Sequence, residues 1–169
     1  MRGIRLRPGT SNLPSELPSG SFVHFFAPVL PRLRLVHWLY HSWPFAQRDD
    51  AFRQALSELP PSDGTYNSGF GYIPPDLLLP RFAHFVTDDW ASLYGFHTKP
   101  DASSFFKAME SGSYWTVLDR TADLCFFNVD AVWWDFYARD ESLLEIVRTH
   151  AASLGNVNVE ERDLLNADW

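Results

Sequence analysis

The sequence predicts an α+β fold: a single domain in which an antiparallel β-meander, at about residues 113–138, packs against several α-helices. Three observations support this fold class. The chain has 169 residues, of which 46% are hydrophobic, so one domain with a sizeable core can form. Helical patterns come first, three strand-like runs follow, and an amphipathic pattern closes the chain. No unit of about 20 to 50 residues repeats, which excludes solenoids and propellers.

The N-terminal region has the least regular pattern. Residues 1–20 are rich in Arg, Pro, Ser and Gly without periodicity, which predicts a flexible or irregular tail before a globular domain at 21–169. The apolar run Phe22–Phe26 predicts a short buried strand. Residues 32–43 suit either a strand or a helix, and Pro31 at a first-turn position favours the helix.

The middle of the chain predicts two helices around a loop. Asp49 or Asp50 can cap the first helix, because apolar residues follow at helical spacing: Phe52, Ala55, Leu56 and Leu59. Residues 62–75 concentrate Gly, Ser, Asn, Asp and Pro around three aromatic side chains, which is typical of a loop. Residues 76–86 predict a short second helix.

A capped helix precedes the predicted meander. Asp101 or Ser103 supplies its N-cap, and Gly112 stands where a left-handed C-terminal residue is expected. Three runs of aromatic and β-branched residues then predict the strands of the meander: Tyr114–Leu118, Leu124–Val129 and Val132–Ala138.

The last of these runs alternates along the chain, so its two faces can be assigned. The first set of residues is the natural core face: Val132, Trp134, Phe136 and Ala138. The second set faces the other side of the sheet: Trp133, Asp135 and Tyr137.

The C-terminal region begins with the clearest helix. Asp140 caps it, Glu141 lies in its first turn, and Gly155 ends it. Residues 156–159 predict a short edge strand, and residues 160–169 predict a terminal helical turn or two.

Charge is distributed unevenly along the chain. The net charge of -7 divides into +3 for residues 1–50, -2 for residues 51–100 and -8 for residues 101–169. Acidic residues repel the phosphates of nucleic acids and attract basic partners. The sequence therefore argues against nucleic-acid binding through the C-terminal half.

Enzyme-type motifs are weak or absent. His37 and His41 would share one face of a helix, but no third metal ligand lies nearby in the sequence. Cys125 stands in an apolar strand, where a thiol is usually inert, and as the single cysteine it forms no internal disulfide. No phosphate-binding glycine motif or nucleophile motif occurs. We therefore expect no metal and no cofactor.

Two patches are candidate partner-binding sites. The first consists of Trp133, Asp135 and Tyr137, a carboxylate between two large rings on the outer face of the last predicted strand. The second consists of Asp88, Asp89 and Trp90. The alternative for the first patch is that helices cover both faces of the sheet, so that its rings belong to the core and Asp135 is a buried, hydrogen-bonded acid.

The segment from Leu124 to Gly155 resembles the immunity proteins of bacterial polymorphic-toxin systems. It contains a strand ending in Asn-Val-Asp, a Trp-rich strand, a Tyr-Ala-x-Asp turn and an amphipathic helix. The upstream Gly-Tyr-Ile-Pro-Pro at 71–75 and the triplet at 88–90 are similar as well. The resemblance implies a single-domain α+β protein that inhibits a cognate toxin stoichiometrically in the cytoplasm of the producing cell.

The leading hypothesis is therefore a non-enzymatic, acidic, cytoplasmic domain that binds a protein partner, expected to be a basic toxin domain. No segment is apolar enough to span a membrane, and no secretion signal precedes the domain. A small enzyme or ligand-binding domain is the alternative, with an aromatic pocket formed by Tyr66, Phe70, Tyr72 and His84 or His97. A third hypothesis is a structural subunit of a larger assembly.

Overall fold

The computed structural model describes residues 1–9, 21–42, 70–73, 75, 91–112, 114–129 and 132–166. Its strands are β1 (Arg2–Pro8), β2 (His37–Ser42), β3 (Phe70–Ile73), β4 (Ala91–Phe96), β5 (Leu124–Val129), β6 (Trp133–Ala138) and β7 (Val157–Asp163). Its α-helices are α1 (Ser21–Phe26), α3 (Ala102–Ser111), α4 (Tyr114–Thr121) and α5 (Glu141–Leu154), with 3-10 turns η1 (Leu30–Leu33) and η4 (Leu164–Asn166).

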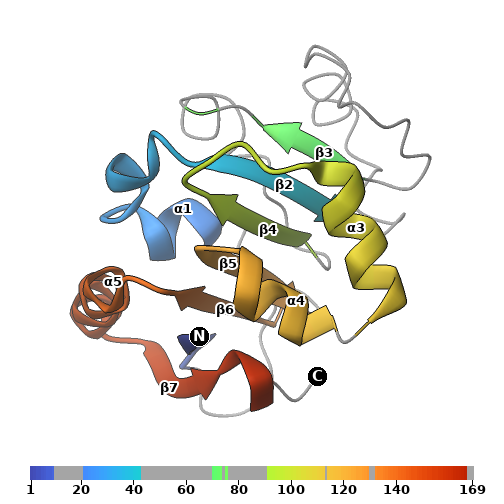
Figure 1. The fold of residues 1–169 in the computed structure, drawn as a ribbon. Helices are drawn as coiled ribbons and strands as arrows, with labels where there is room; N and C mark the ends of the chain where they lie inside the picture. Colours follow the sequence, from blue (N-terminus) through green and yellow to red (C-terminus); the bar gives the residue numbers. More distant parts are fainter. Residues whose placement is uncertain are drawn as a thin grey trace.

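The seven strands form one antiparallel sheet in the order β3-β2-β4-β5-β6-β1-β7. Figure 1 shows this stack, with β3 at the top and β7 at the bottom. The N-terminal strand β1 lies between β6 and β7, so the two ends of the chain meet in the same part of the sheet. An α+β fold with antiparallel strands is confirmed.

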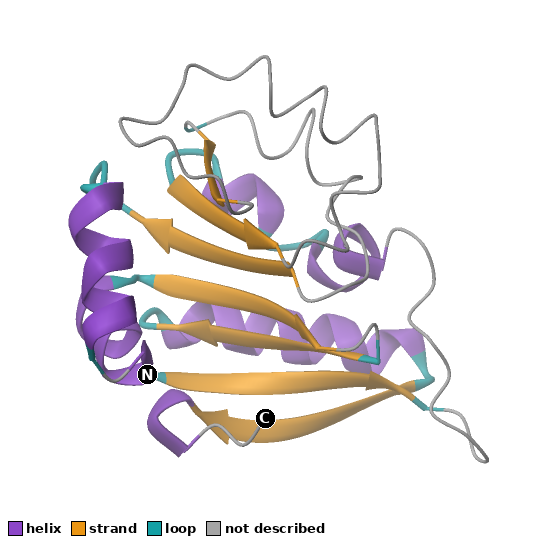
Figure 2. Cartoon of the chain, turned by 90° about the vertical axis from the view of Figure 1, so that its right-hand side faces the viewer, coloured by secondary structure: helices purple, strands orange, loops and turns teal. Residues whose placement is uncertain are grey.

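Helices cover both faces of the sheet (Figures 1 and 2). On one face, α1, η1 and α5 pack against a core that includes Phe126, Trp134 and Phe136. On the other face, α3, α4 and η4 pack against a second core that includes Phe127 and Tyr137. Because neighbouring residues of a strand point to opposite faces, β5 and β6 supply aromatic rings to both cores. Two packed cores, one on each face of the sheet, therefore share the aromatic residues of these strands.

The predictions for the C-terminal half are largely confirmed. β5 and β6 pair as a hairpin, and Trp134, Phe136 and Ala138 lie in the core on the α5 side. The carboxylate of Asp140 accepts a hydrogen bond from the backbone N–H of Ser142 (2.9 Å) at the start of α5. Gly155 ends α5 with a φ of 77°, in the left-handed region that glycine favours. The edge strand β7 also exists, but it extends to Asp163. The predicted helical turns at 160–169 are therefore wrong for residues 160–163, and a single 3-10 turn, η4, follows at Leu164–Asn166.

Two predictions near residue 30 are wrong. Phe22–Phe26 belongs to helix α1, and its buried rings Phe22, Phe25 and Phe26 follow the i, i+3, i+4 spacing of a helix. The run is too short for length to distinguish helix from strand. The predicted helix at 32–43 is instead the turn η1, which begins near Pro31, followed by strand β2.

Two further corrections concern α3 and α4. Tyr114–Leu118, predicted as the first strand of the meander, lies in helix α4, where Leu118 is buried against the second core. Packing of this helix outweighs the strand propensity of its aromatic residues. Asp101 caps α3 as predicted, but Gly112 is extended, with a φ of -138°, and is not in the left-handed region.

The expectation of an irregular tail is wrong for its first part, because Arg2–Pro8 forms β1. Ile4 and Leu6 are fully buried, and Arg5 and Arg7 project from the opposite face of the strand. The predicted helices near 49–59 and 76–86 lie outside the described residues, as does most of the predicted loop, of which 70–73 forms β3. None of the helices that the structure describes is long and apolar enough to cross a membrane.

Candidate functional site

The first predicted partner-binding patch is buried. Asp135 and Tyr137 are 0% exposed, and Trp133 is half-buried. The prediction that these side chains form an exposed docking patch is therefore wrong, and the alternative of a buried, hydrogen-bonded acid is correct. The physical reason is that β1, α4 and η4 pack around this face of β6. The second patch, Asp88, Asp89 and Trp90, lies outside the described residues.

A buried ion pair joins β1 to β6. The Nε of Arg5 donates to one carboxylate oxygen of Asp135 at 2.6 Å, and one terminal nitrogen donates to the other oxygen at 2.7 Å. This two-point geometry is the strong form of an arginine–carboxylate pair. The guanidinium carbons of Arg5 and Arg7 also lie 4.5 and 4.6 Å from the ring centroid of Trp133. These residues anchor the N-terminal strand and form no accessible patch.

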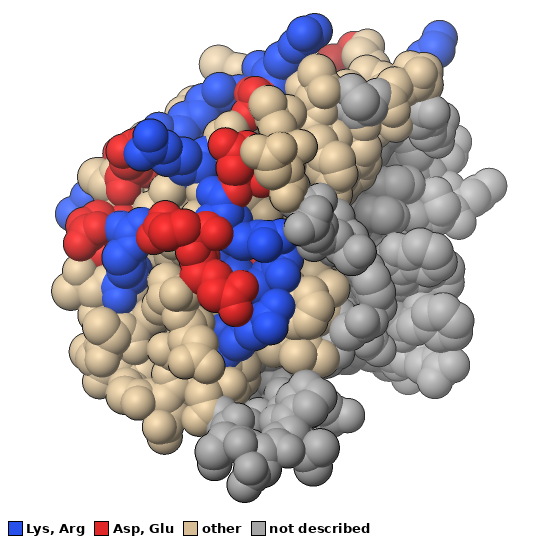
Figure 3. Space-filling view, turned by 90° about the horizontal axis from the view of Figure 1, so that it is seen from below, with Lys and Arg blue, Asp and Glu red and all other residues tan. Residues whose placement is uncertain are grey.

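The arginines of β1 neutralise acids of the C-terminal half. Arg2 pairs with Glu141 at 3.3 Å and Arg7 with Glu160 at 3.7 Å, in addition to the pair between Arg5 and Asp135. Arg148 of α5 likewise pairs with both Glu145 and Glu161. Figure 3, seen from below where β7 lies, shows basic and acidic side chains interleaved. This part of the surface therefore carries mixed charge, although the C-terminal half is acidic as a whole.

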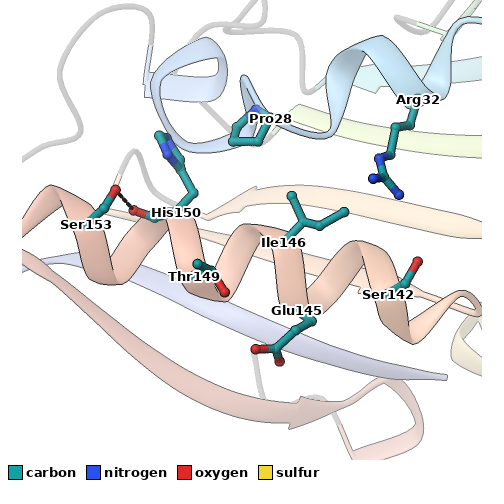
Figure 4. A pocket seen from close by; sticks show the side chains of 8 residues that line it. All are labelled: Pro28, Arg32, Ser142, Glu145, Ile146, Thr149, His150 and Ser153. Carbon is teal, nitrogen blue, oxygen red and sulfur yellow. Dashed lines mark hydrogen bonds between the residues drawn. The ribbon is translucent and has the colours of Figure 1, made fainter.

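An open groove lies between α5 and the segment that links α1 to η1 (Figure 4). It has a volume of about 710 Å³. Pro28 and Ile146 form its apolar part, and the side chain of Arg32 reaches down from η1 toward α5 at one end. The remaining lining comes from α5: Ser142, Glu145, Thr149, His150 and Ser153.

Several polar groups of this groove make contacts within the protein. The Nε2–H of His150 donates to the carbonyl oxygen of His24 at 2.9 Å, which ties α5 to α1. Glu145 is engaged by Arg148. Hydrogen bonds from Ser142 hold the pKa of Asp140 below its ordinary value, and the charge of Arg32 contributes to this. Among the lining residues that the structure describes, no acid and base are paired with each other.

The predicted aromatic pocket is described only in part. Tyr66 and His84 lie outside the described residues, and Phe70 is known only as part of β3. The hydroxyl of Tyr72 lies 2.7 Å from Nδ1 of His37, and Nζ of Lys99 is 5.3 Å from the Tyr72 ring centroid. Burial raises the pKa of Tyr72. His97 is exposed, and its backbone N–H donates to a carboxylate oxygen of Asp123 at 2.7 Å.

Metal binding finds no support among the described residues, where no group of three His, Cys, Asp or Glu side chains could hold an ion. His37 and His41 lie on strand β2 and not on a helix, so the helical face proposed for them does not exist.

Cys125 is fully buried in β5, and burial raises the pKa of its thiol. Because the thiolate is the reactive form, we expect the native protein to react with a thiol reagent at pH 8 at least about 100-fold more slowly than the urea-unfolded chain. A colourimetric thiol assay measures this directly, since one cysteine gives one equivalent. Rapid modification of the folded protein would contradict the buried position of this side chain.

The fold and the groove define an α+β protein with an antiparallel sheet between two layers of helices and a groove beside α5. No family model, no curated protein and no solved structure matches this chain.

Sequence reasoning missed β1 and the groove for different reasons. The alternation of Ile4 and Leu6 with Arg5 and Arg7 is a period-two signal that predicts a strand. The groove has no such signal, because Pro28 and Arg32 meet Ile146 only through tertiary packing.

Proposed function

We propose that the protein is a non-enzymatic protein-binding domain that acts as an immunity protein, neutralising a cognate bacterial toxin domain by stoichiometric binding in the cytoplasm. The observation that carries this proposal is the open groove beside α5. It joins an apolar surface at Ile146 and Pro28 to the cationic side chain of Arg32, and no acid and base are paired among its described lining residues. Such a surface suits an interface, where an apolar centre is surrounded by polar side chains.

The overall charge supports the choice of partner. At -7, the chain attracts a basic toxin domain over long distances even though many of its described acids are paired locally. Within the groove, an apolar side chain of the partner would cover Ile146, and a carboxylate or carbonyl oxygen beside it would accept hydrogen bonds from Arg32.

The test is co-expression of the chain with the toxin domain encoded beside its gene, followed by measurement of the dissociation constant. We expect a one-to-one complex. Thr149→Trp places a bulky ring in the groove and should weaken binding at least about 10-fold, or about 1.4 kcal/mol. Thr149 is exposed, so this change leaves the core intact.

Ala152→Trp is the matched control, because Ala152 is an exposed residue of α5 that does not line the groove. It should bind like the unmodified chain. Equal binding by both variants would show that the groove is not the interface. If the neighbouring toxin domain forms no complex with the unmodified chain, the proposed function itself is wrong.

A further inference from the structure

We infer that the outer edge of β7 binds an extended segment of a partner protein with basic side chains at defined positions, by adding it to the sheet as an eighth strand. This surface is separate from the groove beside α5. β7 is the last strand of the sheet, it has seven residues, and it pairs with β1 on one side only among the described strands. An edge of this kind presents backbone groups that another chain can pair with.

Two hydrogen bonds show which backbone groups of β7 face outward. The N–H of Gly9 donates to the carbonyl oxygen of Asn156 at 2.6 Å, and the N–H of Leu164 donates to that of Met1 at 2.9 Å. Both pairs continue the uninterrupted register between β1 and β7. In an antiparallel ladder, hydrogen-bonded and non-hydrogen-bonded pairs alternate.

The hydrogen-bonded pairs at the two ends of β7 show which of its residues bond to β1. The even-numbered residues of β7 direct their backbone groups toward β1: Asn158, Glu160 and Arg162. The odd-numbered residues direct theirs away from the sheet: Val157, Val159, Glu161 and Asp163. The outer edge therefore offers four sets of outward N–H and C=O groups, one at every second residue.

The side chains of β7 specify the chemistry of the added strand. β7 carries three acidic residues and one arginine. Glu160 and Glu161 pair with Arg7 and Arg148, but 44% and 69% of their side chains are exposed. Exposed pairs of this kind contribute little energy, so both carboxylates can still interact with an added strand. Val157 and Val159 are half-buried against the core beneath α5. An antiparallel strand thus gains from basic residues opposite the acids and apolar residues opposite the two valines.

Strand β1, which pairs with the other edge of β7, has the same pattern of basic and apolar residues. Its register places Arg2 opposite Asp163, Arg5 opposite Glu160 and Leu6 opposite Val159. A second copy of β7 does not meet it, because it would bring three more acids to an acidic edge. The occupant that fits is therefore a basic strand from another protein and not a second copy of this chain.

The probe is the peptide Lys-Thr-Lys-Lys-Val-Thr-Val, which runs antiparallel to β7 with its first Lys opposite Asp163 and its last Val opposite Val157. The full-length chain is labelled with ¹⁵N, and amide exchange and chemical shifts are followed by NMR. In the free protein, the amides of Glu160 and Arg162 should exchange slowly and those of Val159 and Glu161 rapidly. With the peptide, the latter two should shift and become protected at least about 10-fold.

Two variants separate backbone pairing from charge. Glu161→Ala keeps the outward N–H and removes the charge, whereas Glu161→Pro removes both. We expect Glu161→Pro to bind at least about 10-fold more weakly than Glu161→Ala, with the amides of Glu160 and Arg162 still protected as evidence of an intact fold.

Three results would overturn the inference. They are slow exchange of the Val159 and Glu161 amides in the free protein, equal binding of the matched peptide Glu-Thr-Glu-Glu-Val-Thr-Val, and no shift at either amide with millimolar peptide. Self-association of the free protein through these amides would also contradict the inference, because the added strand would then be a second copy of this chain. None of these results depends on whether a toxin domain binds the groove, so the two proposals can fail separately.

Discussion

Asp135→Ala is expected to lower the free energy of unfolding by about 3–5 kcal/mol, because it leaves the Arg5 guanidinium buried without its carboxylate. Asp135 is 0% exposed and Arg5 is 5% exposed, so water cannot replace the lost partner at low cost. Equilibrium urea unfolding near pH 7, followed by circular dichroism, measures the effect.

Two controls identify the cause. The double variant Arg5→Met/Asp135→Leu removes both charges and should recover most of the lost stability, since an apolar pair can replace a buried ion pair. Glu141→Ala breaks the exposed pair with Arg2 and should cost less than about 0.5 kcal/mol. If Asp135→Ala costs no more than Glu141→Ala, the buried pair does not anchor β1.

Gly3→Ala is expected to lower the free energy of unfolding by about 3 kcal/mol. A Cβ atom at Gly3 would lie 2.3 Å from Cδ1 of Tyr137 and 2.6 Å from the backbone oxygen of Phe136. The ring of Tyr137 is fully buried and the oxygen belongs to the ladder, so neither can move away without disturbing β6. Urea unfolding again measures the loss.

Gly112→Ala is the comparison for this prediction. Its Cβ atom would meet only the backbone oxygen of Ala108, at 3.3 Å, and Gly112 is exposed. It should change the free energy of unfolding by less than about 1 kcal/mol. Similar losses for the two variants would mean that the close packing of β1 on Tyr137 is not what makes Gly3 necessary.

Both predictions concern the contact between β1 and β6, which we expect to contribute strongly to the free energy of unfolding. The junction combines a buried ion pair with a ring packed directly on the backbone of a glycine. It also explains the uneven charge of the chain, because the basic N-terminal strand lies among the acidic residues of the C-terminal half.

Sequence patterns predicted an element correctly where its caps or its alternation of side chains lie within one short segment. Asp140 and Gly155 mark the two ends of α5, and the alternation from Trp133 to Ala138 assigns the faces of β6. They failed for Phe22–Phe26 and Tyr114–Leu118, where short aromatic runs suit a helix or a strand equally and packing makes the choice.

For the candidate site, the sequence by itself determined that Trp133, Asp135 and Tyr137 share one face of a strand. Only the tertiary structure decided that this face is covered, because the partner of Asp135 is Arg5, 130 residues away. The sequence likewise did not reveal the groove at Ile146 or the edge of β7 that no other described strand covers. A local pattern shows which side chains point together, but long-range pairing decides whether they meet protein or water.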